Sequence, residues 1–269
     1  MCLKMFKIVA LLTDFGTEDH YVGVVKAKIL KELKKPLNVN FIDITHKIPP
    51  QDVRKAALSL YFSYKYFPFG TIFLTIVDPG VGTERKALVI KTDKFTFVGP
   101  DNGIFSLIYS ENPDFTPFEI IESKVLKAPY SSTFHGRDLF APAVAYILDE
   151  ITFEEFLKPI SKDELKVLSF PLPEKTLNGY KLSIWYVDSF GNIITNFHKD
   201  IVKGPFKVQV NKKEVPLVKS YGYAKKGELI ALFGSEGLLE IAIREGSAFK
   251  VLLNPEIEVI LEEEKWKFI

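Results

Sequence analysis

Four short segments of this sequence are polar or glycine-rich although the sequence around them is strongly apolar. They are LTDFGTEDHYVG (residues 12–23), VDPGVGTER (77–85), FVGPDNGIF (97–105) and STFHGRDLFAP (132–142). The first three each follow a run with the pattern of a buried β-strand. In an open parallel sheet, ligands bind in the crevice beyond the carboxyl ends of the strands. We therefore expect an enzyme active site at these segments.

The second and fourth segments carry an aspartate, an arginine and a histidine that could converge. Asp78 and Arg85 flank a Pro-Gly-Val-Gly turn, which either brings an anion and a cation to a ligand site or only stabilises its own loop. His135 precedes a predicted helix, and a helix N-terminus disfavours the imidazolium form. A neutral imidazole can accept a proton or orient a water molecule. These three residues are our candidate catalytic set, and Phe134 is a candidate substrate contact.

The first segment places Asp14 between a predicted strand and a predicted helix. A carboxylate there can accept hydrogen bonds from the two hydroxyls of a ribose, or it can cap the helix. The G-x-G-x-x-G fingerprint is absent here, and the sequence has no P-loop, so we do not expect a pyrophosphate-bearing cofactor. A nucleoside without phosphates is compatible with this pattern.

Two further polar segments interrupt sequence that otherwise has a β pattern. Residues 188–192 (DSFGN) are either a hairpin turn or a loop that binds a base. In the second interpretation Asp188 and Asn192 offer polar groups to the base and Phe190 stacks on it. Residues 233–237 (FGSEG) have the same two interpretations.

The elements that must position these residues change in character along the chain. Strands are predicted at 6–12, 37–44, 71–77, 86–92 and 95–98, and helices at 21–34, 51–61, 104–109 and 137–150. This alternation predicts an α/β domain with a mostly parallel sheet over residues 1–160. Residues 161–179, which contain two prolines and mixed charges, are predicted to be a linker. Short strands with Gly and Asn turns then predict an all-β, barrel-like domain over 180–269.

Composition limits the classes of partner. The 269 residues carry 35 basic and 34 acidic side chains, and this balance gives no reason to expect nucleic acid or an anionic membrane as a partner. The apolar run before Asp14 is too short for a signal peptide, and no run approaches the length of a membrane span. A single cysteine, Cys2, excludes an internal disulfide, and the four histidines show no zinc-binding spacing. We expect a cytoplasmic protein without a metal site.

Taken in order, the polar segments resemble one protein family. The ordered set is TDFG, DITH, VDPGVGTER, GPDNG, TFHGRD, DSFGNIITN and GSEG, and it extends over nearly the whole chain. This set is similar to that of the S-adenosyl-L-methionine hydroxide adenosyltransferases, which are relatives of the fluorinating and chlorinating enzymes that also attack S-adenosylmethionine (SAM). Each motif alone is weak, whereas the ordered set is specific.

The resemblance implies hydrolysis of SAM to adenosine and methionine, with SAM as substrate and no cofactor. It implies an N-terminal α/β domain, a C-terminal β-barrel and a homotrimer. Active sites would lie between the N-terminal domain of one subunit and the C-terminal domain of its neighbour. In this resemblance Asp78, Arg85 and His135 position the water, and Asp14 binds the ribose hydroxyls.

The resemblance also assigns substrate contacts in the second half of the chain. Asp188, Phe190 and Asn192 match positions that hold the methionine end and the adenine. Ser235 lies in the matching C-terminal loop. Halogenating members have an arginine after this serine, whereas this chain has Glu236, so the resemblance assigns no residue to the methionine carboxylate.

Three positions separate water chemistry from halide chemistry in this resemblance. The fluorinating relatives have Tyr where Asp78 stands, Thr where Val81 stands and a halide-binding Ser where Gly136 stands. The three departures remove hydroxyl donors, and Asp78 adds an anion that repels halide. The sequence thus indicates a hydrolase. The alternatives are a SAM-dependent halogenase and a non-catalytic protein that binds adenosine or SAM.

Overall fold

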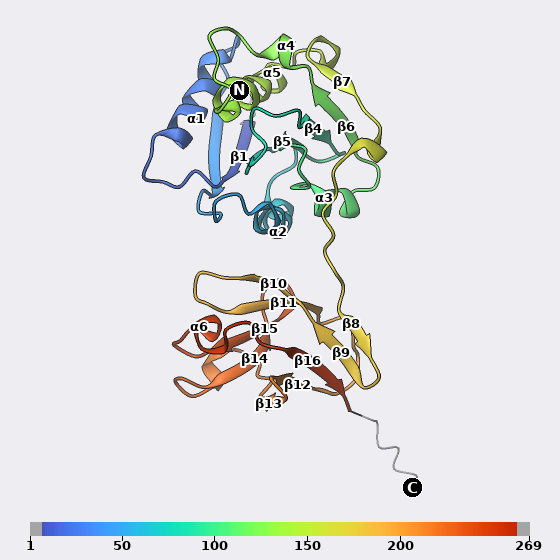
Figure 1. Cartoon of the computed structure of the whole chain (residues 1–269). Helices are drawn as coiled ribbons and strands as arrows, with labels where there is room; N and C mark the ends of the chain where they lie inside the picture. The colour runs from blue at the N-terminus through green and yellow to red at the C-terminus, as the bar shows by residue number, and fades with distance from the viewer. Residues whose placement is uncertain (1–6, 263–269) are drawn as a thin grey trace, which may run out of the picture. The chain divides into compact units, whose positions relative to one another are not determined.

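The computed structural model describes residues 7–262, so Cys2 lies outside the described residues. The chain divides between Ser169 and Phe170 into two compact units, which Figure 1 colours from blue to yellow and from yellow to red. This division falls inside the segment that we expected to be a linker. The domain limits at 160 and 180 stay predictions, and each unit is described below by itself.

The first unit is built on one mixed sheet. Its strands are β1 (Lys7–Thr13), β2 (Val39–Thr45), β3 (Ile72–Ile76), β4 (Ala87–Lys91), β5 (Thr96–Pro100), β6 (Thr116–Ile120) and β7 (Leu157–Pro159), in the order β2-β1-β3-β5-β4-β6-β7. Neighbours from β2 to β5 are parallel, whereas those from β5 to β7 are antiparallel. The prediction of a mostly parallel sheet therefore needs correction on one side. Only residues 92–95 join β4 to β5, and a parallel pair needs a much longer crossover.

Helices cover both faces of this sheet. They are α1 (Tyr21–Glu32), α2 (Val53–Ser63), α3 (Ser106–Glu111), α4 (Glu122–Val125) and α5 (Ala141–Leu148). Successive residues of a strand point to opposite faces, so Leu11 joins the core that includes α1 and α5, and Leu12 joins the core that includes α2 and α3. The helix predicted over 137–150 begins as a π turn (Gly136–Phe140) and continues as α5.

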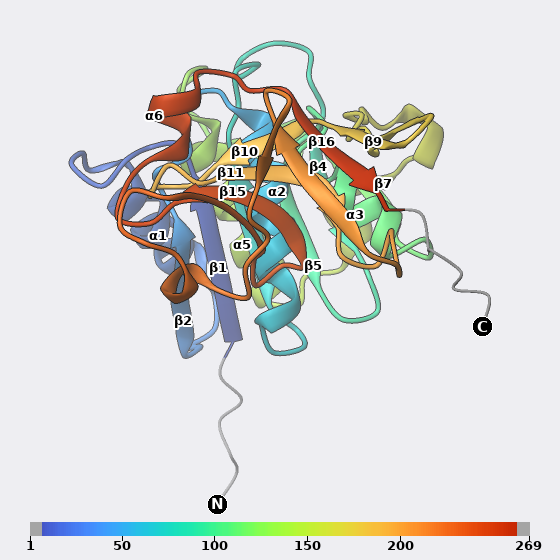
Figure 2. The same cartoon turned by 90° about the horizontal axis from the view of Figure 1, so that it is seen from below.

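The second unit consists of short antiparallel strands. They are β8 (Glu174–Thr176), β9 (Gly179–Leu182), β10 (Ile184–Val187), β11 (Ile193–His198), β12 (Phe206–Val210), β13 (Lys213–Val215), β14 (Leu229–Phe233), β15 (Leu238–Ile243) and β16 (Ile257–Leu261). The short helix α6 (Ala248–Leu252) lies between β15 and β16. One sheet has the order β10-β11-β15-β14, and the other has the order β13-β12-β16-β9-β8. Figure 2 shows β10, β11 and β15 side by side. The two sheets share one hydrophobic core, to which the first contributes Phe197 and Ile241 and the second contributes Val259.

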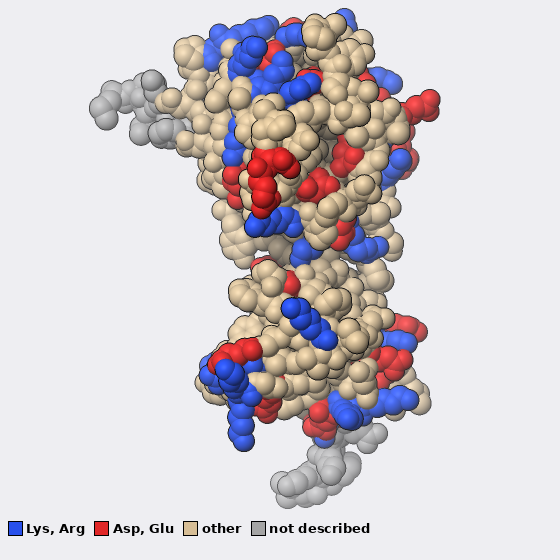
Figure 3. All heavy atoms as spheres, turned by 60° about the vertical axis from the view of Figure 1, so that its left-hand side comes forward, with Lys and Arg blue, Asp and Glu red and all other residues tan. Residues whose placement is uncertain are grey.

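The surface carries charges of both signs. On the side of the molecule shown in Figure 3, basic and acidic side chains occur on each unit. This mixture agrees with the net charge of +1. Among the described residues, no helix has both the length and the apolar character needed to span a bilayer.

Candidate active site

One edge of the first unit's sheet gathers its predicted site residues. Asp14 directly follows β1, and Asp78 lies just beyond β3. Arg85 precedes β4, which runs antiparallel to β5 with Ala87 opposite Pro100. The amino end of β4 therefore lies at the same edge as the carboxyl ends of β1, β3 and β5. The antiparallel direction of β4 is what brings Arg85 to Asp78.

Asp78 and Arg85 form a buried ion pair. Arg85 Nε donates to Asp78 Oδ1 at 3.1 Å and to Oδ2 at 3.0 Å, and Nη2 donates to Oδ2 at 2.6 Å. The Arg85 side chain is 3% exposed and that of Asp78 is 6% exposed. The guanidinium also lies 5.2 Å from the centroid of the Phe140 ring. These contacts fix the plane of the guanidinium as well as its position.

Gly82 allows this loop to approach the loop that carries His135. Its φ is +76°, in the left-handed region that favours glycine. A Cβ at this position would lie 2.6 Å from the backbone oxygen of Ser132. The absence of a side chain at Gly82 thus allows its loop to lie close to the loop that carries His135.

His135 completes the cluster from the residue before the π turn. Its Nδ1 lies 3.1 Å from Arg85 Nη2, and because a guanidinium only donates hydrogen bonds, Nδ1 is the acceptor. The proton of the neutral ring is therefore on Nε2. Burial, followed by the Arg85 charge, lowers the pKa of His135, while Glu122, Asp78 and Asp138 act in the opposite direction. His135 is neutral at pH 7, with burial as the main cause.

Phe134 belongs to an aromatic cluster beside His135. Its ring centroid lies 5.9 Å from that of Phe15 and 5.3 Å from that of Tyr21, with edge-on geometry in both pairs. Gly136 borders the same cluster, because a Cβ there would lie 3.3 Å from the rings of Phe134 and Phe15. Our reading of the sequence missed Phe15 and Tyr21, although both lie in the polar segment 12–23.

Asp14 does not cap the following helix, so one of its two interpretations is excluded. The N-cap of α1 is His20, and no side chain caps that end. Asp14 Oδ2 instead accepts a hydrogen bond from the backbone N–H of Gln51 at 2.9 Å. The half-buried carboxylate thus stands at the sheet edge, held on one side by the segment that precedes α2.

The DITH motif fixes the loop that carries Asp14. His46 is buried, and its Nδ1 lies 2.9 Å from the hydroxyl of Thr13. The backbone oxygen of His46 accepts from the N–H of Gly16 at 2.8 Å. Asp43 lies 3.0 Å from His46 Nε2, which orients the ring. Residues on both sides of Asp14 are therefore tied to one histidine, which explains a motif whose role the sequence left open.

The DSFGN segment of the second unit is the hairpin turn between β10 and β11. Asp188 Oδ1 accepts from the N–H groups of Phe190 and Asn192, both at 2.9 Å, and Oδ2 accepts from Asn192 Nδ2 at 2.9 Å. The turn also borders a pocket of about 1150 Å³ whose lining includes Asp188, Phe190, Asn192 and Ser235. Phe190 is 78% exposed, whereas Asn192 is buried. The turn interpretation is confirmed, and the same turn lines a pocket.

Two residues of this pocket were missed from the sequence. Tyr221 donates to Glu240 Oε2 at 2.6 Å and lies 3.4 Å from Asn192 Nδ2. Burial raises the pKa of the Glu240 carboxyl, and the nearby charges of Asp188 and Glu236 raise it further. Ser235 Oγ donates to Glu236 at 3.2 Å. Only the folded sheets bring these residues together, because they are distant in sequence from the DSFGN turn.

The predicted site residues thus fall into two groups, one in each unit. Asp78 and His135 both contact Arg85, and Asp14 and Phe134 lie in loops at the same sheet edge. The second group consists of the four residues in the pocket of the second unit, Asp188, Phe190, Asn192 and Ser235. Within residues 7–262, no group of three or more histidine, cysteine or acidic side chains is placed to hold a metal ion.

Comparison with known families identifies the chain. The model described as the SAM hydroxide adenosyltransferase N-terminal domain matches residues 9–157, and that of the C-terminal domain matches residues 182–256. This chain belongs to the SAM hydroxide adenosyltransferase family. The resemblance inferred from the ordered motifs is therefore confirmed.

Individual proteins that are similar to this chain support the same family assignment. Proteins named (R)-S-adenosyl-L-methionine hydrolase match it from Thermus thermophilus (38% identity, 91% of this chain and 94% of the relative) and from Methanocaldococcus jannaschii (36%, 94% and 95%). A crystal structure of an uncharacterized conserved protein from Thermotoga maritima superposes with a TM-score of 0.81 at 37% identity, covering 93% of this chain and 99% of that one. A fluorinase from Actinoplanes is less similar, at 25% identity over 87% of this chain and 90% of its own length.

Proposed function

We propose that this chain is a SAM hydrolase, in which a water molecule attacks C5′ of the ribose and releases adenosine and methionine. Its family membership and the names of its more similar relatives support this reaction. The observation that carries the proposal is the buried cluster of Asp78, Arg85 and His135 at the strand-end edge of the sheet. These are the residues that the family resemblance assigns to the positioning of water.

The leaving group determines what the protein has to supply. The sulfur of SAM leaves as a neutral thioether, so departure requires no general acid. The difficult task is to prepare and orient a nucleophile derived from water. Arg85 stabilises developing negative charge on the water oxygen, and the Nε2–H of His135 can donate a hydrogen bond to it. Orientation of the water in line with the C5′–S bond contributes up to about 7–11 kcal/mol in reactions of this kind.

We assign the substrate contacts to residues of both units. Asp14 accepts from the ribose hydroxyls, and Phe134 borders the reacting carbon. Asp188, Phe190, Asn192 and Ser235 hold the adenine and the methionine end. The homotrimer with sites shared between subunits, the barrel-like closure of the second unit and the cytoplasmic location are further parts of this proposal, and the family resemblance supports the first two.

Halide chemistry is disfavoured at two positions. The carboxylate of Asp78 is paired with the guanidinium of Arg85, and its negative charge would repel a halide ion there. At Gly136, a serine side chain would have its Cβ 3.3 Å from the Phe134 and Phe15 rings, so these rings would have to move to admit a halide-binding hydroxyl.

Product analysis tests the proposal. The purified chain is incubated with SAM with and without chloride, and the products are separated by chromatography. We expect adenosine and methionine in equal amounts, independent of chloride. Chloride-dependent formation of 5′-chloro-5′-deoxyadenosine would instead identify a halogenase. Binding of adenosine without any turnover of SAM would identify a non-catalytic binding protein.

A further inference from the structure

The turn that presents Asp14 is closed by the hydroxyl of the residue before it. Thr13 Oγ1 accepts a hydrogen bond from the backbone N–H of Phe15 at 3.2 Å, so the two residues that flank Asp14 are joined across it. Threonine hydroxyls that bond two residues ahead stabilise a turn in place of a backbone hydrogen bond. Thr13 is 1% exposed, so solvent does not compete for this bond. The orientation of Asp14 therefore depends on a buried side chain.

The Thr13 hydroxyl is in turn oriented by side chains at the end of β2. Asp43 Oδ2 accepts from Lys26 Nζ of α1 at 2.7 Å, and Asp43 Oδ1 lies 3.0 Å from His46 Nε2. Burial raises the pKa of the Asp43 carboxyl, but hydrogen bonds from Lys26 and His46 outweigh it and lower that pKa below its usual value. An ionised carboxylate only accepts, so Nε2 carries a proton. The Nδ1 of a neutral ring then accepts from Thr13 Oγ1, which lies 2.9 Å away.

A β-bulge in β2 lies beside this chain of contacts. Leu11 of β1 pairs with Asp43. The next residue, Leu12, pairs with Thr45, so β2 has one extra residue between its two partners. Bulges are rare in parallel pairs, and they are over-represented next to active sites, where they redirect side chains. Here the bulge directly precedes the end of β2, from which His46 reaches Thr13.

The chain that follows β2 also holds the carboxylate itself. Asp14 Oδ2 accepts from the backbone N–H of Gln51 at 2.9 Å, and the next residue, Asp52, caps the start of α2. Asp14 Oδ1 has no hydrogen-bond partner within residues 7–262, and it is not closed off from solvent. One oxygen of Asp14 is thus fixed by the protein, and the other is free to accept from a ligand hydroxyl.

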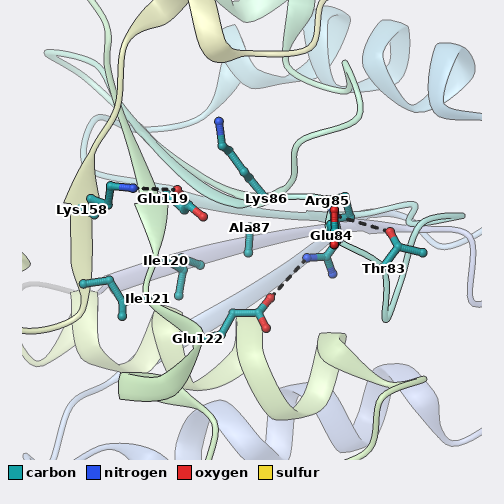
Figure 4. Close-up of a pocket in the computed structure, with 10 residues that line it drawn as sticks. All are labelled: Thr83, Glu84, Arg85, Lys86, Ala87, Glu119, Ile120, Ile121, Glu122 and Lys158. Atoms are coloured by element: carbon teal, nitrogen blue, oxygen red, sulfur yellow. Dashed lines mark hydrogen bonds and ion pairs between the residues drawn. The ribbon is translucent and has the colours of Figure 1, made fainter.

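The pocket beside Arg85 is separate from this arrangement. Figure 4 shows that pocket, of about 350 Å³, with Arg85 and Glu122 pointing toward each other. No residue of β1, of β2 or of the Asp14 turn lines it. The hydrogen bonds that hold the turn come instead from His46 and Gln51.

We propose that Thr13 and His46 are positioning residues that set the affinity of the site for the two ribose hydroxyls through Asp14. This inference rests on the proposed function, which assigns those hydroxyls to Asp14. Because the protein fixes the turn in advance, binding of the ribose does not have to order it. A ligand without the two hydroxyls gains nothing from this arrangement. Loss of either positioning residue should therefore affect only ligands that carry the hydroxyls.

The test compares adenosine with 2′,3′-dideoxyadenosine, which lacks both ribose hydroxyls, by calorimetry. We expect the wild-type chain to bind adenosine at least about tenfold more tightly, because hydrogen bonds to a charged group are among the strong ones. T13V keeps the shape of the side chain and removes its hydroxyl. It should weaken adenosine binding by about tenfold and leave dideoxyadenosine binding unchanged, so that the preference for adenosine largely disappears.

T75V is the matched control for T13V. Thr75 is fully buried on the neighbouring strand β3, and its hydroxyl has no hydrogen-bond partner among the described residues. This variant should keep the wild-type preference for adenosine. H46A removes the ring at the other end of the contact with Thr13, and it should lower the preference as T13V does.

D14N tests whether the effect passes through Asp14. This variant removes the charge and keeps the size of the side chain, so it should itself lose the preference for adenosine. Addition of T13V to D14N should then change neither dissociation constant. A further loss of adenosine binding in the double variant would show that Thr13 acts by another route.

Three results would overturn the proposal. The first is a wild-type preference in T13V and H46A, and the second is equal weakening of both ligands, as a general loss of structure would produce. The third is equal binding of both ligands by the wild-type chain, which would also remove the ribose contact of Asp14. Hydrolysis of SAM by the wild-type chain tests the proposed function separately, so the two failures are distinguishable.

Discussion

Arg85 donates hydrogen bonds to Asp78 and contacts His135 through one planar group, so a single side chain sets the geometry of both partners. A lysine cannot reproduce this arrangement, because an ammonium has one nitrogen and no fixed fork of donors. The ion pair is also buried, and removal of one member leaves the other as an uncompensated charge. The proposed chemistry and the stability of this edge therefore both depend on Arg85.

We expect R85A and R85K each to lower kcat by about 10²–10³-fold, the effect of losing one preorganised donor to a developing oxyanion. R85A should also lower the free energy of unfolding by about 3–5 kcal/mol, because it leaves Asp78 buried without its partner. Steady-state kinetics and urea unfolding measure these effects, and adenosine binding should stay detectable. Unchanged turnover in either variant would remove Arg85 from the mechanism.

His135 makes stability depend on pH in a defined direction. Burial and the Arg85 charge hold the pKa of His135 below its ordinary value of 6.5 in the folded state. Between that lower value and about 6.5 the unfolded chain binds the proton and the folded chain does not, so the free energy of unfolding rises with pH. This contribution is complete above pH 6.5 and is lost as pH falls through the folded pKa.

H135N should therefore show a weaker pH dependence of the free energy of unfolding than wild type below about pH 6.5. Urea unfolding at a series of pH values measures it. H198N is the matched control, because the side chain of His198 is 41% exposed and lies in the second unit. Equal slopes for H135N and wild type would show that His135 is not held neutral by the fold.

At the scale of elements, the site depends on the contact between two loops. The loop after β3 and the loop before the π turn meet where Gly82 faces Ser132. The π turn then continues into α5, whose residues are buried in the core of the first unit. Arg85 and His135, which these two loops carry, lie at hydrogen-bond distance from each other.

G82A tests this contact, and G70A is its matched control. Both glycines have positive φ, +76° and +83°, so either substitution costs about 1 kcal/mol in backbone conformation. Only at Gly82 would the new Cβ meet a neighbour, 2.6 Å from the oxygen of Ser132, whereas Gly70 faces open space. We expect G82A to lose at least about tenfold in kcat and G70A to keep the wild-type kcat. Equal kcat for the two variants would contradict this role of Gly82.

Local patterns in the sequence predicted many of the strands and helices, but they did not predict the direction of every strand or all residues of the candidate site. Hydrophobic periodicity predicted β1 to β5 and the helices α1, α2, α3 and α5, because the burial of an element's faces is reflected in the pattern of adjacent residues. It missed the strands β6 and β7 and the short helix α4. The direction of β4 depends on its partners across the sheet, which no local pattern encodes. Tyr221 and Glu240 were missed for the same reason.

At the scale of the whole molecule, the candidate residues are divided between two compact units. The cluster around Arg85 belongs to the first unit, and the pocket around Asn192 belongs to the second. The proposed trimer would complete each site with residues from two subunits. Closed rings with head-to-tail interfaces allow this arrangement, because each subunit then contributes different surfaces to its two neighbours.

Co-expression of R85A with N192A tests the shared site. Each variant alone should have almost no activity, because one half of every site is defective. In randomly mixed trimers with sites between subunits, about a quarter of the sites combine an intact first unit with an intact second unit. We therefore expect about a quarter of the wild-type activity in the mixture. No recovery in verified mixed trimers would place each site within one subunit.

The most direct test of the central claim is SAM turnover in water labelled with oxygen-18, followed by mass spectrometry of the products. Attack of water at C5′ puts one labelled oxygen into the 5′ hydroxyl of adenosine and none into methionine. We predict that every adenosine molecule formed carries this label. Adenosine without the label, or label in methionine, would show that water does not attack C5′ and would contradict the account.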